Sequence, residues 1–214
     1  MSKKIVFDFD QTLTTFDTIY PFLLFCNKDN IFLKFLKKFA WYLCSILYRL
    51  KIVDNFTLKN CGVKIFFKNY DKKYIEKKEE EFIKKIKYFD EVFNKLKEHL
   101  HKGNKVYISS ASFEEYLNSF SNLYSLPLTI LASQLEFKDN KVKGIKFNNY
   151  GEKKADYFKK NNIEIDLLYT DSYSDKSLAY LAKKIIIIDK KGHIIEIDSY
   201  EKFVNYFRGS TSLA

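Results

Sequence analysis

A short apolar run that ends abruptly in two acids constrains the fold of this chain more than any other feature. Ile5-Val6-Phe7 has the β-branched and aromatic character of a buried parallel strand, and Asp8-Phe9-Asp10-Gln11-Thr12 follows it directly. Strand alternation predicts that Asp8 and Asp10 point to the same side, about 7 Å apart. Two carboxylates at that spacing repel an anion unless a cation joins them, and Mg²⁺ suits such oxygen ligands. The alternative is a pair of loop acids that cap the next helix.

Three later stretches also place polar side chains where a strand is predicted to end or a helix to begin. Ser110 follows a second apolar run, Lys154 opens a helical pattern after a glycine, and Asp171 and Asp175 follow a third apolar run. Together with the first stretch, this order resembles the haloacid dehalogenase superfamily of phosphotransferases. The signature of that superfamily is Asp-x-Asp-x-Thr, then Ser or Thr, then Lys, then paired acids. The resemblance spans nearly the whole chain.

The resemblance implies a chemical role for each of these residues. Asp8 would be the nucleophile that forms an aspartyl-phosphate, Asp10 would be the general acid and base, and Lys154 would balance charge. The residues implied are Asp8, Asp10 and Lys154 for catalysis; Thr12, Ser110 and Ala111 for substrate binding; and Asp8, Asp10, Asp171 and Asp175 for Mg²⁺.

Within the superfamily, the lysine segment is similar to the phosphoserine-phosphatase-like branch. The pattern Gly-x-x-Lys of that branch selects Lys154 over Lys153 after Gly151, but the spacing alone leaves both lysines open. A small residue usually precedes the first of the paired acids in the family, whereas Thr170 stands there in this chain. This departure concerns the geometry of the loop and leaves the two carboxylates in place.

The order of predicted elements indicates an α/β fold with a doubly wound parallel sheet and an inserted all-helical cap. Strands are predicted at residues 5–7, 105–108, 128–132, 167–170, 185–188 and 194–197, with a hairpin of 133–137 and 142–147. Ligands of such sheets bind at the carboxyl ends of the strands, where all of the signature residues fall. We expect a core of residues 1–15 and 88–209, a cap of 16–87 and a frayed tail of 210–214.

The expected cap consists of helical patterns without an intervening strand signal. These patterns cover residues 20–26, 31–50, 57–67 and 72–86. In the superfamily such an insertion between the first two strands is a cap of the first type. A cap that closes over the acids would exclude water and supply the contacts that select a substrate.

The second cap helix allows two interpretations. Residues 39–48 are the most apolar run in the chain, but ten residues are about half of what a membrane-spanning helix needs. Because apolar residues surround the whole helix, we favour a buried position inside the cap. The alternative is a helix that lies on a membrane surface, with nearby cations at anionic headgroups. These cations are Lys34, Lys37, Lys38, Arg49 and Lys51.

The second strand is predicted to lead into a helix through a capping box. Ser112 and Glu115 have the spacing of that motif, so Ser112 is assigned a structural role. Ser110 is then left to donate a hydrogen bond to a phosphate oxygen, beside the backbone N–H groups of the first helical turn.

Composition and charge narrow the class of partner. The net charge of +10 favours anionic substrates, but the lysines are spread along every segment, so nucleic-acid binding is not expected. Cys26, Cys44 and Cys61 form no Cys-x-x-Cys pair, and the chain starts without a signal-peptide pattern. We therefore expect a cytoplasmic location with reduced thiols. The sequence does not indicate the oligomeric state.

These patterns lead to one preferred function and two alternatives. We expect a Mg²⁺-dependent hydrolase of a small phosphomonoester that acts through an aspartyl-phosphate. The first alternative is a lipid-phosphate phosphatase of the phosphatidylglycerophosphatase type at the membrane surface. The second is a non-catalytic module that binds phosphate or nucleic acid, which we would expect to have lost Asp8 or Asp10; both are present.

Overall fold

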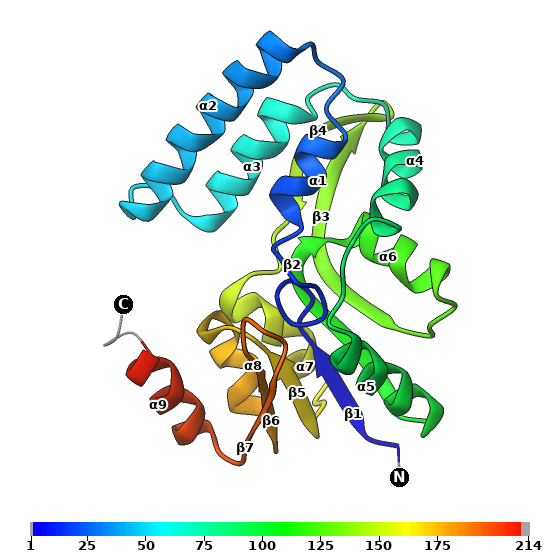
Figure 1. Ribbon diagram of the computed structural model, residues 1–214, viewed down its shortest axis with the longest axis vertical. Helices are drawn as coiled ribbons and strands as arrows, with labels where there is room; N and C mark the ends of the chain where they lie inside the picture. The colour runs from blue at the N-terminus through cyan, green and yellow to red at the C-terminus, as the bar shows by residue number, and fades with distance from the viewer. Residues whose placement is uncertain (1, 211–214) are drawn as a thin grey trace.

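The computed structural model describes residues 2–210, and this part of the chain forms a seven-stranded sheet with helices on its faces and above one end (Figure 1). The strand order is β4-β3-β2-β1-β5-β6-β7. The strands are β1 (Lys4–Phe7), β2 (Lys105–Phe113), β3 (Thr129–Lys138), β4 (Lys141–Phe147), β5 (Leu167–Thr170), β6 (Ile185–Ile188) and β7 (Ile194–Ile197). The five central strands run parallel, whereas β4 and β7 are antiparallel to their neighbours. The predicted α/β class is confirmed, with a mixed rather than wholly parallel sheet.

Nine α-helices lie within the described residues. They are α1 (Ile19–Phe25), α2 (Ile31–Arg49), α3 (Asn55–Phe66), α4 (Lys72–Ile83), α5 (Asp90–His101), α6 (Glu114–Leu123), α7 (Asp156–Lys160), α8 (Lys176–Leu181) and α9 (Tyr200–Ser210). Two short 3-10 helices, η1 (Gly151–Ala155) and η2 (Tyr173–Asp175), precede α7 and α8. The predicted tail of 210–214 meets the end of α9 at Ser210 and otherwise lies outside the described residues.

The central position of β1 explains why its sequence is a continuous apolar run. Its residues pair with β2 on one side and with β5 on the other, and Ile5, Val6 and Phe7 are fully buried. Ile5 and Phe7 belong to one apolar cluster, while Val6 faces a second cluster on the opposite face of the sheet. A strand covered on both faces needs apolar side chains at consecutive positions. The carboxyl end of β1 is therefore fixed at the middle of the sheet.

The prediction of a separate third strand and hairpin arm was wrong, because the two segments form one strand. β3 runs without a break past Ser133, pairing first with β2 and then with β4. Ser133 is buried where the pairing changes, and its hydroxyl donates to the carbonyl of Ala111 at 2.8 Å. A polar residue that satisfies its hydrogen bond inside the sheet gives the same sequence signal as a turn.

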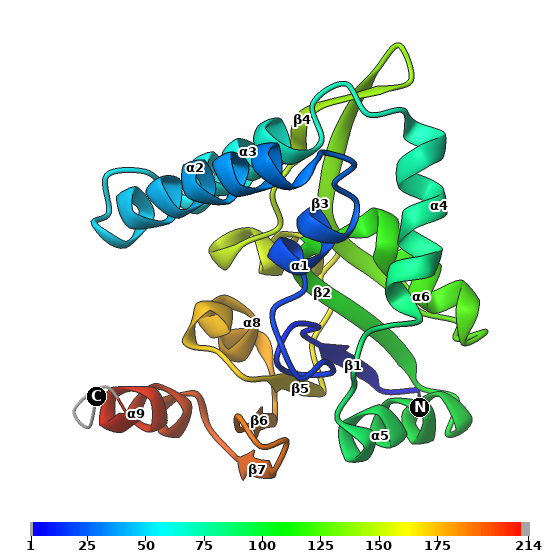
Figure 2. The same cartoon turned by 45° about the horizontal axis from the view of Figure 1, so that its top comes forward.

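Helices α1 to α4 stand over one end of the sheet, whereas α5, which also lies between β1 and β2, packs against β2 (Figures 1 and 2). α3 packs on β4 and α4 packs on α6, so this layer contacts the core at two places, one on the sheet and one on a helix. Phe22 of α1 and Val63 of α3 belong to the same apolar cluster as Phe113, the last residue of β2, and Tyr116 of α6. We retain residues 16–87 as the proposed cap, with the core on either side of it.

α2 does not occupy the buried position that we predicted, and none of its residues is buried. It packs along α3 and otherwise lies at the outside of the molecule, as Figure 2 shows. Trp41 on its inner side stacks on Tyr20, with ring centroids 5.5 Å apart. Ile31 is 88% exposed and Phe35 is 68% exposed. The prediction failed because an apolar helix surface is buried only if a neighbour covers it. Within residues 2–210, no helix is long and apolar enough to cross a membrane.

Candidate active site

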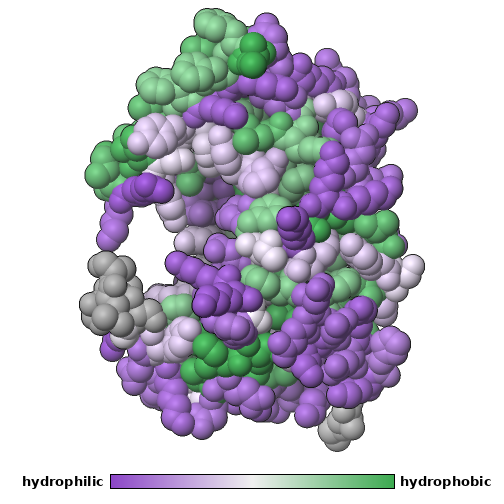
Figure 3. Space-filling view, viewed as in Figure 1, coloured by the Kyte–Doolittle hydropathy of each residue, from purple (hydrophilic) through white to green (hydrophobic). Residues whose placement is uncertain are grey.

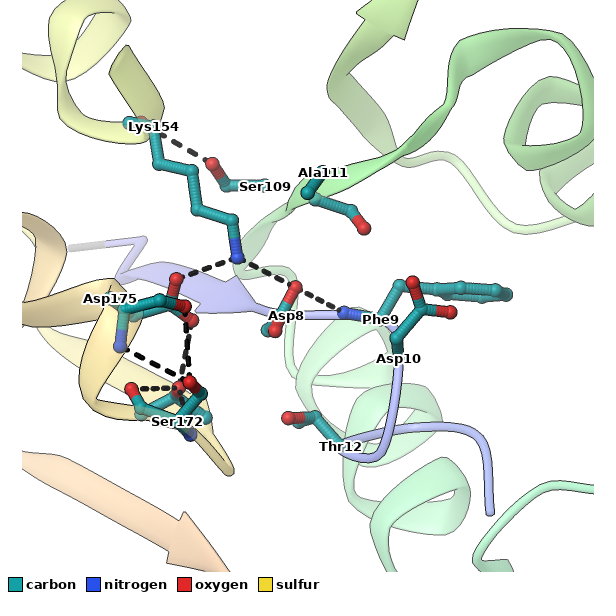
Figure 4. Close-up of polar contacts among 12 residues, drawn as sticks. Asp8, Phe9, Asp10, Thr12, Ser109, Ala111, Lys154, Ser172 and Asp175 are labelled. Atoms are coloured by element: carbon teal, nitrogen blue, oxygen red, sulfur yellow. Dashed lines mark hydrogen bonds and ion pairs between the residues drawn. The ribbon is translucent and has the colours of Figure 1, made fainter. Parts of the chain in front are cut away.

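Asp8 is held directly after β1, where the sheet ends. Its backbone N–H donates to the carbonyl of Tyr169 at 2.9 Å, which continues the pairing with β5 by one residue. Its Oδ1 accepts a hydrogen bond from the N–H of Phe9 at 2.8 Å and lies 2.9 Å from Nζ of Lys154 (Figure 4). Burial raises the pKa of Asp8 well above its usual range, and the charge of Lys154 opposes that rise.

Lys154 joins two carboxylates that come from different strand ends. Its Nζ lies 2.9 Å from Asp8 and 2.6 Å from Oδ1 of Asp175, and its side chain is only 2% exposed. Burial alone would lower the pKa of Lys154, but Asp175 and Asp8 outweigh it and hold that pKa above its usual range. Lys153, the other lysine left open by the sequence, is exposed. The lysine within the site is therefore Lys154.

The paired acids lie in the turn that follows β5. Oδ2 of Asp175 accepts a hydrogen bond from the hydroxyl of Thr170 at 2.7 Å, and that hydroxyl accepts one from the N–H of Ser172 at 3.1 Å. Thr170, which departs from the family pattern, thus orients both the turn and Asp175. Asp171 lies in the same turn, and its Oδ1 accepts a hydrogen bond from the hydroxyl of Thr12 at 3.1 Å. Burial and the charge of Asp175 raise the pKa of Asp171 to about 6.

Asp10 points away from Asp8 and toward the helical layer. Its Oδ1 accepts from the N–H of Thr18 at 2.9 Å and from the hydroxyl of Thr18 at 2.5 Å, and its Oδ2 accepts from the hydroxyl of Ser112. The predicted alternation of strand side chains does not apply to Asp8 and Asp10, because β1 ends at Phe7. Burial, and then the charge of Asp17, raise the pKa of Asp10 to about 7. A carboxyl group with a pKa near neutrality can both donate and accept a proton.

Ser112 does not form the predicted capping box. β2 continues through Ser112 to Phe113, and α6 begins without a side-chain cap. The hydroxyl of Ser112 instead donates a hydrogen bond to Asp10. The carboxylate of Glu115 accepts a hydrogen bond from the N–H of Leu135 at 2.9 Å. The motif misled because β2, with a register shift between Ser109 and Phe113, continues through Ser112, where the helix was expected to begin.

Ser110 and Ala111 lie on the wall of the site. Oγ of Ser110 accepts from the N–H of Ser112 at 3.0 Å, which leaves the hydroxyl proton of Ser110 for another acceptor. Both residues line a cavity of about 320 Å³, and Asp8, Asp10 and Lys154 line the same cavity.

The helical layer supplies the other walls of this cavity. They include Asp17, Tyr20, Trp41, Tyr48 and Lys59. Lys59 is 3% exposed, and its Nζ donates to the carbonyl of Ala111 and to Oδ1 of Asn148, each at 2.6 Å. Burial lowers the pKa of Lys59 to about 7, although Asp10 and Asp17 raise it. The segment between β1 and β2 therefore adds an acid and a second lysine to the cavity wall.

The model of the haloacid dehalogenase-like hydrolases matches residues 5–179, which include all of the signature residues described above. The chain belongs to the haloacid dehalogenase-like hydrolases. The predicted family and the prediction of an enzyme are thus confirmed, and the non-catalytic alternative is not supported. No curated protein matches this hydrolase in sequence.

Solved structures share the fold of this hydrolase. A protein of unknown function from Bordetella pertussis Tohama I has a TM-score of 0.71 at 14% identity, over 84% of this chain and 86% of that one. A substrate-bound phosphoserine phosphatase complex has a TM-score of 0.63 at 19% identity, over 96% and 98%. A phospho-aspartyl intermediate analogue of phosphoserine phosphatase has a TM-score of 0.59 at 21% identity, over 96% and 98%.

The carboxylates of this hydrolase fit Mg²⁺ in chemistry, although they are not a ready-made cage. Within residues 2–210, no group of three or more His, Cys, Asp or Glu side chains is arranged to hold a metal ion. Both oxygens of Asp175 are engaged, by Lys154 and by Thr170. Asp8 and Asp171 remain, and Mg²⁺ typically uses one or two carboxylates together with waters and substrate phosphate. The buried acids Asp8 and Asp175 and the half-buried Asp171 face one lysine, and a cation would balance this excess negative charge.

Sequence reasoning missed three contributors to this hydrolase's site. Thr18 and Ser112 hold Asp10, and Lys59 reaches the site from α3. A Thr ten residues after the Asp-x-Asp-x-Thr stretch begins, or a lysine in a helical pattern, carries no signal of its own. Only the packing of α1 and α3 over the sheet brings these side chains to the acids.

Proposed function

We propose that this hydrolase cleaves phosphomonoesters through a covalent phosphoryl group on Asp8. The observation that carries the proposal is the pairing of two differently held acids at one cavity. Asp8 contacts the ammonium of Lys154, which opposes the rise in its pKa caused by burial, whereas Asp10 has a pKa of about 7 and is held by neutral donors. Two carboxyl groups with such different environments are suited to a nucleophile and an acid–base partner.

The reaction consists of two displacements at phosphorus. A carboxylate oxygen of Asp8 attacks phosphorus, the bond to the substrate oxygen breaks, and Asp10 gives its proton to that leaving oxygen. Water then attacks the phosphoryl group, Asp10 takes a proton from the water, and inorganic phosphate leaves with Asp8 restored. The hydroxyl of Ser110, the N–H of Ala111 and the ammonium of Lys154 would orient the phosphoryl oxygens.

Mg²⁺ would be held by Asp8, the carbonyl of Asp10 and Asp171, with Asp175 as a support that orients Lys154. When bound, it would neutralise phosphoryl charge beside the lysine. Thr12 would set the orientation of Asp171, because its hydroxyl donates to that carboxylate at 3.1 Å. This assignment differs from the phosphate contact that the resemblance implied for Thr12.

We propose a small phosphorylated metabolite as the substrate, supported by the size and charge of the cavity. About 320 Å³ holds a phosphate with a compact leaving group, and Asp17 and Lys59 offer one acidic and one basic partner for polar groups on it. A panel of phosphorylated metabolites, assayed for phosphate release with Mg²⁺ and with chelator, tests the function. Metal-dependent release from compact phosphomonoesters is expected, and release from none of the panel contradicts it.

A phosphate carried by a membrane lipid is a second candidate, favoured by the exposed surface of α2. The inner residues Trp41 and Tyr48 line the cavity, so the apolar helix lies directly beside the site. A short-chain lipid phosphate and a water-soluble phosphomonoester, compared by kcat/KM, separate the two candidates. A higher kcat/KM for the lipid would replace the preferred substrate class without changing the proposed chemistry.

A further inference from the structure

The outer side of α2 carries a continuous apolar surface. Its residues recur at helical spacing and are Ile31, Phe32, Phe35, Leu36, Phe39, Tyr42, Leu43 and Leu47. Each is at least 39% exposed, and at about 100° per residue they span an arc of roughly 160°. Figure 3 shows hydrophobic residues gathered over α2, at the upper left. We call these eight residues the α2 face.

The opposite side of the helix explains why the α2 face has no partner within the described residues. Trp41, Cys44 and Tyr48 lie at helical spacing on the inner side, where Trp41 packs against the apolar cluster and Tyr48 lines the cavity. The helix therefore uses one side for the cap and presents the other outward. Solvent-exposed apolar surface of this extent on a protein marks an interaction site.

The charged side chains within residues 31–53 all have one sign. Residues 31–53 contain five cationic residues and no acidic residue. Lys37 is paired with Asp29 at 2.6 Å, on the far side from the face. Lys34, Lys38 and Arg49 fall along one edge of the face by helical geometry, and Lys51 follows the helix. An apolar stripe with cations at its edge is complementary to an anionic lipid surface, which offers acyl chains below and phosphate groups above.

The same charges argue against a second copy of the chain as the occupant. A symmetric dimer through α2 would place the cations near one end, Lys34 and Lys38, against those near the other end, Arg49 and Lys51, or against themselves. Either arrangement brings like charges together without an acid between them, because residues 31–53 have none. Like charges that meet across an interface weaken it.

We propose that the α2 face binds peripherally to anionic lipid bilayers. The helix lies parallel to the bilayer plane, with Phe32, Phe35 and Phe39 inserted among the headgroups and the lysines at the lipid phosphates. Trp41 and Tyr48 face the cavity from the other side of the same helix, so binding places the active site about one helix diameter, roughly 10 Å, from the lipid surface. This proposal does not depend on which phosphomonoester is hydrolysed.

Vesicle sedimentation of the whole protein tests the proposal without any measurement of activity. The protein is expected to pellet with vesicles of phosphatidylcholine and phosphatidylglycerol in equal parts at low salt, less at physiological salt, and weakly with phosphatidylcholine alone. Phe35→Gln/Phe39→Gln should weaken binding at least about tenfold. Lys34→Gln/Lys38→Gln should weaken it about fivefold per lysine. Wild-type protein that stays in the supernatant with anionic vesicles at low salt overturns the proposal.

A matched control lies across the cap on α4. Lys73 and Lys77 are exposed and have the same spacing as Lys34 and Lys38, so Lys73→Gln/Lys77→Gln changes net charge equally. This control should bind vesicles like wild type, and an equal loss would show that overall charge rather than the α2 face is responsible. Sedimentation velocity without lipid adds a second readout. Self-association that Phe35→Gln/Phe39→Gln abolishes, with vesicle binding unchanged, would assign the α2 face to a second copy instead.

Discussion

Thr18 donates twice to the same oxygen of Asp10, through its backbone N–H at 2.9 Å and its hydroxyl at 2.5 Å. Thr18 is the residue before α1, and its hydroxyl also contacts that of Tyr116 at 2.6 Å. The start of the helical layer and the proposed general acid are therefore positioned by one hydrogen-bond network. A change in either should alter the protonation of Asp10.

Substitution Thr18→Val tests this coupling because it keeps the shape of the side chain and removes the hydroxyl donor. Loss of a hydrogen bond to the ionised carboxylate should raise the pKa of Asp10 above its value of about 7. Since leaving-group protonation needs protonated Asp10, the alkaline limb of kcat/KM should move to higher pH by about one unit. Ser112→Ala should move the limb in the same direction. A limb that stays in place in both variants would contradict the role of Asp10.

Substitution Asp8→Asn tests the nucleophile. The amide retains the shape of the side chain but cannot form an acyl-phosphate, so kcat should fall by at least about 10³-fold. Rapid acid quenching followed by hydroxylamine should release phosphate from wild-type enzyme and not from the variant. Turnover within tenfold of wild type would assign the nucleophile elsewhere.

Removal of divalent metal should abolish phosphate release, and added Mg²⁺ should restore it. Asp8 and Asp171 both have raised pKa values because they are buried near other acids, and a bound cation would favour their charged forms. Ca²⁺ should support little activity because it is larger and less strict in geometry. Isothermal titration of Mg²⁺ into wild type and Asp171→Asn gives a readout apart from turnover. Equal affinity in the two proteins would exclude Asp171 as a ligand.

Substitution Lys154→Met should destabilise the protein by roughly 3–5 kcal/mol, because it leaves Asp8 and Asp175 buried without their cation. The loss should shrink at acidic pH, where the two carboxyl groups can take up protons. Lys153→Met is the matched control, since Lys153 is exposed and one position away. Denaturant unfolding of both variants at pH 5 and pH 8 measures the difference. A similar effect of the two substitutions would contradict the structural role of Lys154.

Glu79→Gln should stabilise the protein at pH 8 and have little effect at pH 5. Glu79 of α4 is 5% exposed, and burial together with Glu115 raises its pKa to about 8. A carboxyl group whose folded pKa is raised contributes stability below its unfolded pKa of about 4, and that contribution is lost as pH rises toward 8. Glu76→Gln, exposed on the same helix, serves as the control. If Glu79→Gln shifts the unfolding midpoint equally at pH 5 and pH 8, Glu79 does not titrate between these pH values in the folded protein.

The sequence was sufficient for most of the order of elements and for the acids that follow β1 and β5. β1 and β5 are short apolar runs followed at once by acids, and local composition marks such boundaries without tertiary information. Gly151, with φ of +61°, likewise marked the turn that delivers Lys154. These features depend on neighbours in the chain.

What the sequence did not predict depends on contacts between distant segments. Ser112 matched a local helix motif, but its partner is Asp10, 102 residues away. The surroundings of α2 could not be predicted because periodicity shows which residues are apolar and not whether another element covers them. Lys59 resembled a solvated helix lysine until α3 was placed against Ala111 and Asn148.

The position of β1 has a consequence for the order in which the protein folds. Ile5 pairs with Val106 on one side and with Leu167 on the other, so the sheet around Asp8 closes only after most of the chain has found its place. Long-range pairing of this kind slows folding, because the entropy of loop closure must be overcome before the contacts form. Helical structure should return early during refolding and hydrolytic activity late. The rate at which activity recovers would therefore report the rate at which the central sheet forms.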